Sequence, residues 1–243
     1  MTTPIVLPWT LQRSLEAATR VLLEPVDRPS LDFSQPTGEA ALVSPNSVSW
    51  RVFKNPLSLF IGGVTAVIME LAEPRVRTGV WEHTSFRVDP IRRLRRTGLA
   101  ATVTIYGARS TAEALIARVR RMHDRVAGTT PSGEVYCAND PELLNWVQGT
   151  AAYGFLQAYH TYVRPLSLSE RDCYYAEGIA PAALYGATGA PRSEADLERR
   201  FQAATGRLGA VGYCVRVSDD HAFETNSAAA AKAVSVPVGT SRN

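Results

Sequence analysis

The sequence predicts an all-α protein with a single domain, and three observations support this. An acidic or amide residue directly precedes proline at Asn55-Pro56, Asp89-Pro90 and Asp140-Pro141. Such a pair is typical of a helix start, because the first side chain caps free N–H groups and proline fits the first turn. The apolar residues that follow recur at intervals of three and four. The 243 residues, 45% hydrophobic and 20% charged, are enough to bury one large core.

Residues 1–49 are predicted to form an N-terminal arm, with a short helix over about 11–23 and an irregular segment over about 25–45. Asn55-Pro56 then opens an apolar helix, LSLFIGGVTAVIMELA. Gly62-Gly63 in its middle indicates either close packing of the backbone or the approach of a flat ligand.

Proline residues and spacing also define the next two helices. Pro74 is predicted to start a helix with the sequence RVRTGVWEH, and Asp89-Pro90 one that runs to about Tyr106. On the second helix, Arg93 and Thr97 share a face because they are four residues apart, and Arg96 lies beside them.

The sequence Ser110-Thr111-Ala112-Glu113 predicts a capping box and a helix that runs to about Ala127 and is closed by Gly128. His123 is expected at the edge of the apolar stripe of this helix. Residues 129–139 are predicted to form a loop.

The second half of the chain predicts three more helices. The first runs from Asp140-Pro141 to just before Pro165, and the others are capped by Ser167-x-x-Glu170 and Ser193-x-x-Asp196. The main domain is therefore expected over residues 50–200. Residues 201–243 lack a sustained period and are expected to form an atypical, mobile tail.

Charge and motifs exclude several classes of protein. Of the 26 basic residues only Lys54 and Lys232 are lysine, and residues 73–125 hold twelve arginines against five acids. Such a concentration of arginine favours planar or multi-oxygen anions. Zinc-ligand spacing, glycine-rich nucleotide loops and the G-x-S-x-G motif are missing from the sequence.

Three scattered cysteines and the lack of a secretion signal favour a cytoplasmic protein. Residues 143–163 are uncharged, but they contain enough polar groups to favour a buried helix over a membrane span.

The histidines and the arginine run allow more than one interpretation. His123 fits an axial ligand to haem iron, but the pattern alone favours a core histidine that is satisfied by a backbone carbonyl. Arg93, with Arg96 and Thr97, could bind a haem propionate. The same run could contact nucleic acid or form a solvated basic face. His83 and His160 are candidate distal groups, although a structural or solvent-facing role suits each of them better.

Four segments, in order, carry a resemblance to a known family. They are NPLSLFIGGVTAVIMELAEPRV, GVWEHTSFRVDPIRRLRRT, RVRRMHDRVAGTTPSGEVYCANDPELLNWV and RPLSLSERDCYYAE. From about Trp50 to about Arg199 the sequence resembles the catalytic domain of MpaB-like proteins and rubber oxygenases (latex-clearing proteins). From about Phe201 onward it departs from these relatives.

The resemblance implies a globin-like helical core and one b-type haem. The motif R-x-x-H-x-x-V places the iron ligand at His123, and the motif Arg-x-x-x-Thr places Arg93 and Thr97 beside the haem, with a role in catalysis. Arg96 stands where rubber oxygenases can have a lysine that reaches the distal iron position. A guanidinium stays protonated and is a poor iron ligand, so water or His83 is expected there.

The function that the resemblance implies is haem-dependent activation of O₂ and oxidation or cleavage of an apolar substrate. Because no secretion signal is found, a small isoprenoid or other secondary metabolite is expected rather than an extracellular polymer. Neither nucleic-acid binding nor stable membrane insertion is expected, and the sequence points to no oligomeric state. The alternatives are a haem-binding sensor without catalytic activity and, less favoured, a basic interaction module without a cofactor.

Overall fold

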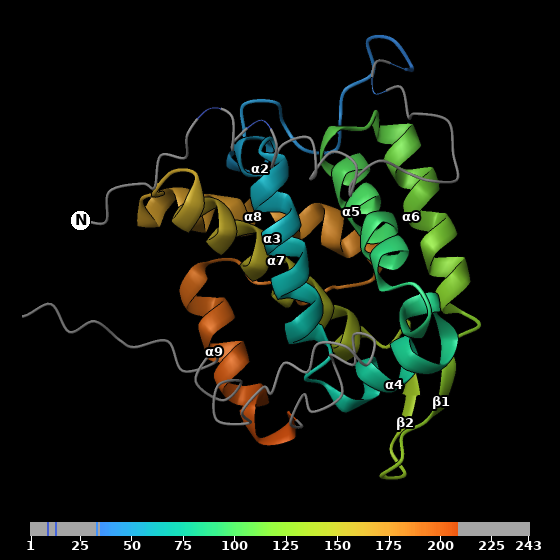
Figure 1. The fold of residues 1–243 in the computed structure, drawn as a ribbon. Helices are drawn as coiled ribbons and strands as arrows, with labels where there is room; N and C mark the ends of the chain where they lie inside the picture. The colour runs from blue at the N-terminus through green and yellow to red at the C-terminus, as the bar shows by residue number, and fades with distance from the viewer. Residues whose placement is uncertain (1–8, 10–12, 14–32, 34, 209–243) are drawn as a thin grey trace, which may run out of the picture.

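The computed structural model describes residues 9, 13, 33 and 35–208. Its helices are packed around a central pair, and a two-stranded sheet lies at one end (Figure 1). The elements, in order, are α2 (Val48–Val52), α3 (Pro56–Glu70), α4 (Pro74–His83), the 3₁₀ helix η1 (Ser85–Arg87), α5 (Pro90–Tyr106), α6 (Arg109–His123), β1 (Ala127–Thr129), β2 (Val135–Cys137), α7 (Pro141–Tyr162), α8 (Leu168–Tyr185), α9 (Glu194–Ala204) and the 3₁₀ helix η2 (Thr205–Arg207).

Apart from that of α6, the predicted starts of the described helices are confirmed, and so is the mainly helical fold. The caps of α3, α5 and α7 are Asn55, Asp89 and Asp140, whose side chains accept backbone N–H groups of Ser58, Arg92 and Glu142. Ser167 and Glu170 form the predicted capping box of α8, and Ser193 caps α9. The globin-like arrangement of the core stays a prediction. The helix expected over residues 11–23 falls, apart from Arg13, outside the described residues.

The predicted boundaries of α6 are wrong at both ends. This helix begins at Arg109 and has no side-chain cap of its own, because the N–H and hydroxyl of Ser110 both donate to the Glu39 carboxylate, at 2.6 and 2.7 Å. A carboxylate from a distant segment has thus replaced the local capping box. At the other end the helix stops at His123.

The segment beyond His123 forms a hairpin rather than a helical turn and a loop. Ala127–Thr129 pairs antiparallel with Val135–Cys137, and Gly128 lies opposite Tyr136. Tyr136 is 4% exposed and anchors the hairpin, whereas its neighbour Val135 faces solvent. The small sheet is a departure from the all-α prediction.

Helices α3 and α7 form the most extensive pair among the described elements (Figure 1). A Cβ atom on Gly62 would lie 2.7 Å from the Cα of Phe155 and 2.8 Å from the carbonyl oxygen of Gly154. Gly154 likewise presses against the backbone of Gly62. At Gly62, therefore, the structure shows close packing of two backbones rather than contact with a flat ligand.

The main apolar core surrounds this crossing. Its buried members include Val52, Phe53, Ile105, Phe155, Leu156, Tyr159, Tyr174, Tyr175 and Leu197. Phe201 of α9 packs on it, with its ring centroid 5.5 Å from that of Trp146 and 5.7 Å from that of Tyr153. Ordered helical structure thus continues past residue 200. Over the described residues no single helix meets the length and hydropathy needed to cross a membrane, although α3 and α4 together would meet them across a 109° bend.

The two neighbouring glycines of α3 should respond oppositely to substitution. Gly62→Ala inserts a methyl group into the α3–α7 contact and should lower the free energy of unfolding by about 1–3 kcal/mol. Gly63→Ala places its Cβ at 3.4 Å from Leu94 Cδ1, which is an ordinary contact. Because alanine has the higher helix propensity, the free energy of unfolding should stay the same or rise by up to about 1 kcal/mol. Urea unfolding of both variants measures the difference. Equal stability of the two would contradict the packing argument.

Candidate functional site

A cavity of about 1150 Å³ lies among α5, α6, α7 and α8, with further walls from α2 and α3. Most of its lining is apolar, including Val103, Leu115, Val119, Val147 and Phe155. Ligand pockets usually measure roughly 300–1,000 Å³. This cavity therefore has room for a large flat molecule and a second, apolar one.

His123 is the last residue of α6 and lines the large cavity. Its Nδ1 atom is buried and makes no hydrogen bond. Burial is the main cause that lowers the pKa of His123, and the charge of Arg93 lowers it further, whereas Asn139 and Asp124 raise it. The imidazole is therefore neutral near pH 7, which is the form that can bind a metal ion.

Asn139 is a neighbour of His123 that sequence reasoning missed. Its side-chain Nδ2 donates to the carbonyl oxygen of Arg120 at 3.1 Å and to Asp124 Oδ1 at 2.6 Å. These bonds hold the Asn139 amide close to the imidazole of His123, where it raises the pKa of the histidine. The buried Oδ1 of Asn139 and Nδ1 of His123 nevertheless do not complete a hydrogen bond with each other. Asn139 was placed in a predicted loop, and the only signal was its position just before the Asp140-Pro141 helix start.

Arg93 of α5 reaches the same cavity with one unsatisfied nitrogen. Its Nη2 lies 3.8 Å from Glu70 Oε2, and its guanidinium carbon is 5.7 Å from the centroid of the Phe86 ring. Its Nη1 is buried and has no hydrogen-bond partner among the residues that the structure describes. A buried donor without a partner is costly, which makes this nitrogen a candidate to bind an oxygen atom from outside the protein.

Glu70, at the end of α3, is the other charged residue that sequence reasoning missed. Its side chain is buried, and burial raises its pKa to about 7, although the charge of Arg93 acts in the opposite direction. A carboxyl group with this pKa can hold or release a proton near neutral pH. The one available signal was a single acidic residue inside the apolar run of α3.

The remaining predicted site residues lie at the cavity edge or away from it. Arg96 and Thr97 line the cavity, together with Arg92 and Arg95, so the arginine run of α5 faces this space. His83 also lines it but is exposed, and its Nε2 lies 3.2 Å from the Tyr136 hydroxyl. His160 lies outside the lining, and its Nδ1 accepts the N–H of Leu166 at 2.8 Å. The structural interpretation of His160 is thus confirmed.

Tyr175 of α8 adds a polar group that the sequence did not reveal. The residue is 2% exposed and lines the cavity, and its hydroxyl has no hydrogen-bond partner. Burial raises its pKa far above the usual range, so the hydroxyl stays protonated. It can donate a hydrogen bond to an oxygen atom of a bound molecule.

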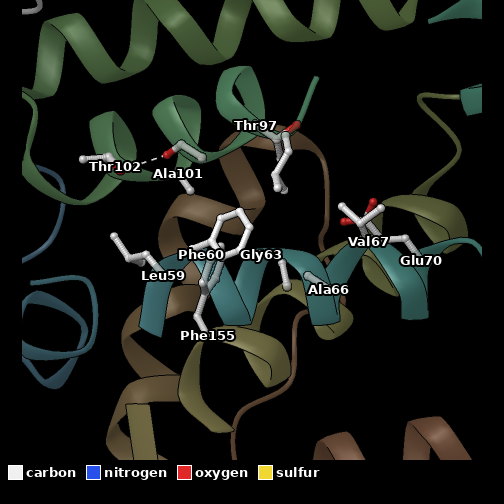
Figure 2. A pocket seen from close by; sticks show the side chains of 13 residues that line it. Leu59, Phe60, Gly63, Ala66, Val67, Glu70, Thr97, Ala101, Thr102 and Phe155 are labelled. Atoms are coloured by element: carbon white, nitrogen blue, oxygen red, sulfur yellow. Dashed lines mark hydrogen bonds between the residues drawn. The ribbon is translucent and has the colours of Figure 1, made fainter. Parts of the chain in front are cut away.

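A second, smaller cavity of about 40 Å³ lies between α3, α5 and α7 (Figure 2). It shares several lining residues with the large cavity, namely Glu70, Thr97, Ala101, Ala151 and Phe155. The two spaces are therefore separated by a common wall of side chains.

The raised pKa of Glu70 predicts a pH-dependent cost to stability. In the unfolded chain the pKa of this group lies near the ordinary glutamate value of 4.5, whereas burial raises it to about 7 in the folded protein. The folded state therefore binds more protons between these values, and stability falls as pH rises through this window. Glu70→Gln should remove this loss, about 3 kcal/mol at pH 7 relative to pH 4. Urea unfolding of both proteins from pH 4 to 8 measures it, and parallel pH profiles would refute the assignment.

A comparison with protein families identifies the family of this chain. A family model described as ER-bound oxygenase mpaB/B'/rubber oxygenase, catalytic domain, matches residues 50–237. The match extends beyond residue 200, where the sequence analysis places the end of the domain. Comparisons with curated proteins and with solved structures gave no match. Because the family model covers most of the chain, the protein belongs to the MpaB and rubber oxygenase catalytic-domain family, which is a family of oxygenases.

Proposed function

We propose that this protein is a haem b-dependent oxygenase that oxidises or cleaves a small apolar substrate. The observation that carries the proposal is the placement of a neutral histidine and an arginine with an unsatisfied nitrogen in one large apolar cavity. Family membership supports the use of O₂. The haem, the substrate and the residue roles are our proposal.

The residues present fit a haem group. His123 would supply the nitrogen ligand to iron, because its imidazole is neutral and faces a cavity of sufficient size. Arg93 would bind a propionate through its Nη1 atom, which no group in the described part of the chain bonds. Arg96, at the cavity edge, offers a second positive charge for the same purpose. When bound, the haem iron supplies the site at which O₂ is activated.

The other residues of the site control water, protons and substrate position. The apolar side chains would keep water away from the part of the large cavity that they line. Thr97 donates its hydroxyl to the carbonyl oxygen of Arg93, at 3.1 Å, and so has no free donor for a bound molecule. Glu70 can hold or release a proton near pH 7. The Tyr175 hydroxyl can fix one oxygen of a substrate that is otherwise apolar.

Removal of the proposed iron ligand should abolish stable haem binding. In protein reconstituted with hemin, His123→Ala should lose most of the Soret absorbance after gel filtration, and Arg93→Ala should lose less, because Arg96 remains. His160→Ala removes a histidine outside the cavity and should keep the haem. Retention of full haem and an unchanged spectrum by His123→Ala would show that the ligand is a different residue.

Asn139 is proposed to orient His123 by accepting its Nδ1–H. Outer partners of this kind raise the basicity of a ligand, and their loss lowers metal affinity by about 10–100-fold. Asn139→Leu should therefore weaken hemin binding, lower the iron–histidine stretching frequency in resonance Raman spectra and raise the reduction potential. A purely structural role would reduce thermal stability and leave the frequency and potential of the bound fraction unchanged.

Oxygen uptake distinguishes catalysis from haem binding without turnover. The reduced, haem-loaded protein should consume O₂ in the presence of at least one member of a panel of alkenes and terpenoids, with oxygenated products detected by mass spectrometry. Binding of haem without substrate-dependent uptake or product would favour the sensor alternative.

A further inference from the structure

The small cavity beside the large one has walls that are almost entirely apolar. It is lined by Leu59, Phe60, Ala66 and Val67 of α3, by Leu94 of α5 and by Phe155 of α7; Figure 2 shows this space. Gly63 lies in the same wall, one residue after the glycine at which α3 and α7 are in closest contact. The cavity exists at this point because Gly63 has no side chain to fill it.

The two hydroxyl groups near this cavity are already used by their own helix. Thr97 donates to the carbonyl oxygen of Arg93 at 3.1 Å, and Thr102 donates to that of Gly98 at 2.8 Å. Both threonines have therefore used their one donor, and toward a guest each hydroxyl can only accept a hydrogen bond. Among the lining residues Glu70 remains as the polar side chain, and it lies at the end of α3 away from Leu59 (Figure 2).

These walls do not suit water. A buried water needs two to four polar partners, and one carboxyl group at the edge of an apolar space does not supply them. The volume of about 40 Å³ is roughly three times the minimum that holds a water-sized molecule. A dry cavity of this size suits a single small apolar molecule.

We propose that this cavity is a docking site for dioxygen, which it holds beside the large cavity before reaction. Thr97, Ala101 and Phe155 line both spaces, so the small cavity adjoins the large one. The inference rests on the proposed oxygenase function for the identity of the gas. The affinity of the cavity for an apolar atom rests on its walls alone.

Xenon tests the cavity without any need for haem or turnover. Crystals of the wild-type protein under xenon pressure should show an anomalous peak between Gly63 and Ala101. Gly63→Ala narrows the cavity by one methyl group and should weaken the peak, and Gly63→Val should remove it. Gly206→Ala is the matched control, because its new Cβ meets nothing within 4 Å. The absence of xenon in the wild type, or ordered water there, would overturn the proposal.

Steady-state kinetics then tests the role of the gas. In the haem-loaded enzyme the Gly63 variants should raise the KM for O₂ severalfold, with no matching rise in the KM for the organic substrate. Xenon binding with an unchanged KM for O₂ would refute oxygen docking. If xenon binds but no O₂ is consumed with any substrate, the proposed function fails and the apolar cavity stands.

Discussion

The contact of α3 with α7 at Gly62 and Gly154 is the constraint on which the site depends. Neither glycine leaves room for a Cβ atom, so the two backbones lie as close as helices can pack. This contact fixes the direction of α3 and thereby the position of Glu70, two turns further on. It also sets Phe155 against both cavities. A looser crossing would move the carboxyl group and the wall between the cavities together.

The charged part of the site is governed by a competition between burial and pairing. Arg93 stands 3.8 Å from Glu70, too far for a close ion pair, and its attraction lowers the pKa of Glu70 less than burial raises it. The net effect is a raised pKa, so Glu70 is partly protonated at pH 7. Because the carboxylate does not fully neutralise Arg93, the guanidinium keeps attraction for an anion from outside the protein. A closer ion pair between Arg93 and Glu70 would keep the carboxyl group ionised and would neutralise the guanidinium. The site would then lose both its proton-holding acid and its attraction for an anion.

The sequence predictions were correct where the residues that determine a feature are adjacent in the chain. The starts of α3, α5 and α7 were predictable because cap and proline are adjacent in the chain. The capping box predicted at Ser110 was wrong, because Glu39, which lies far away in sequence, accepts hydrogen bonds from the N–H and hydroxyl of this serine. His123 and Arg93 were found through helical spacing and the family resemblance. Glu70 and Asn139 were missed because their significance comes from burial and from partners on other segments, which no local pattern records.

The two cavities divide the proposed chemistry by polarity. His123, Arg93 and Tyr175 line the large cavity, and each carries a buried polar atom without a hydrogen-bond partner among the described residues. In the small cavity the threonine hydroxyls are bonded within α5, and the space can attract a guest only through its apolar walls. Glu70 lines both. A proton held there would be within reach of the reaction while the approach through the small cavity stays apolar.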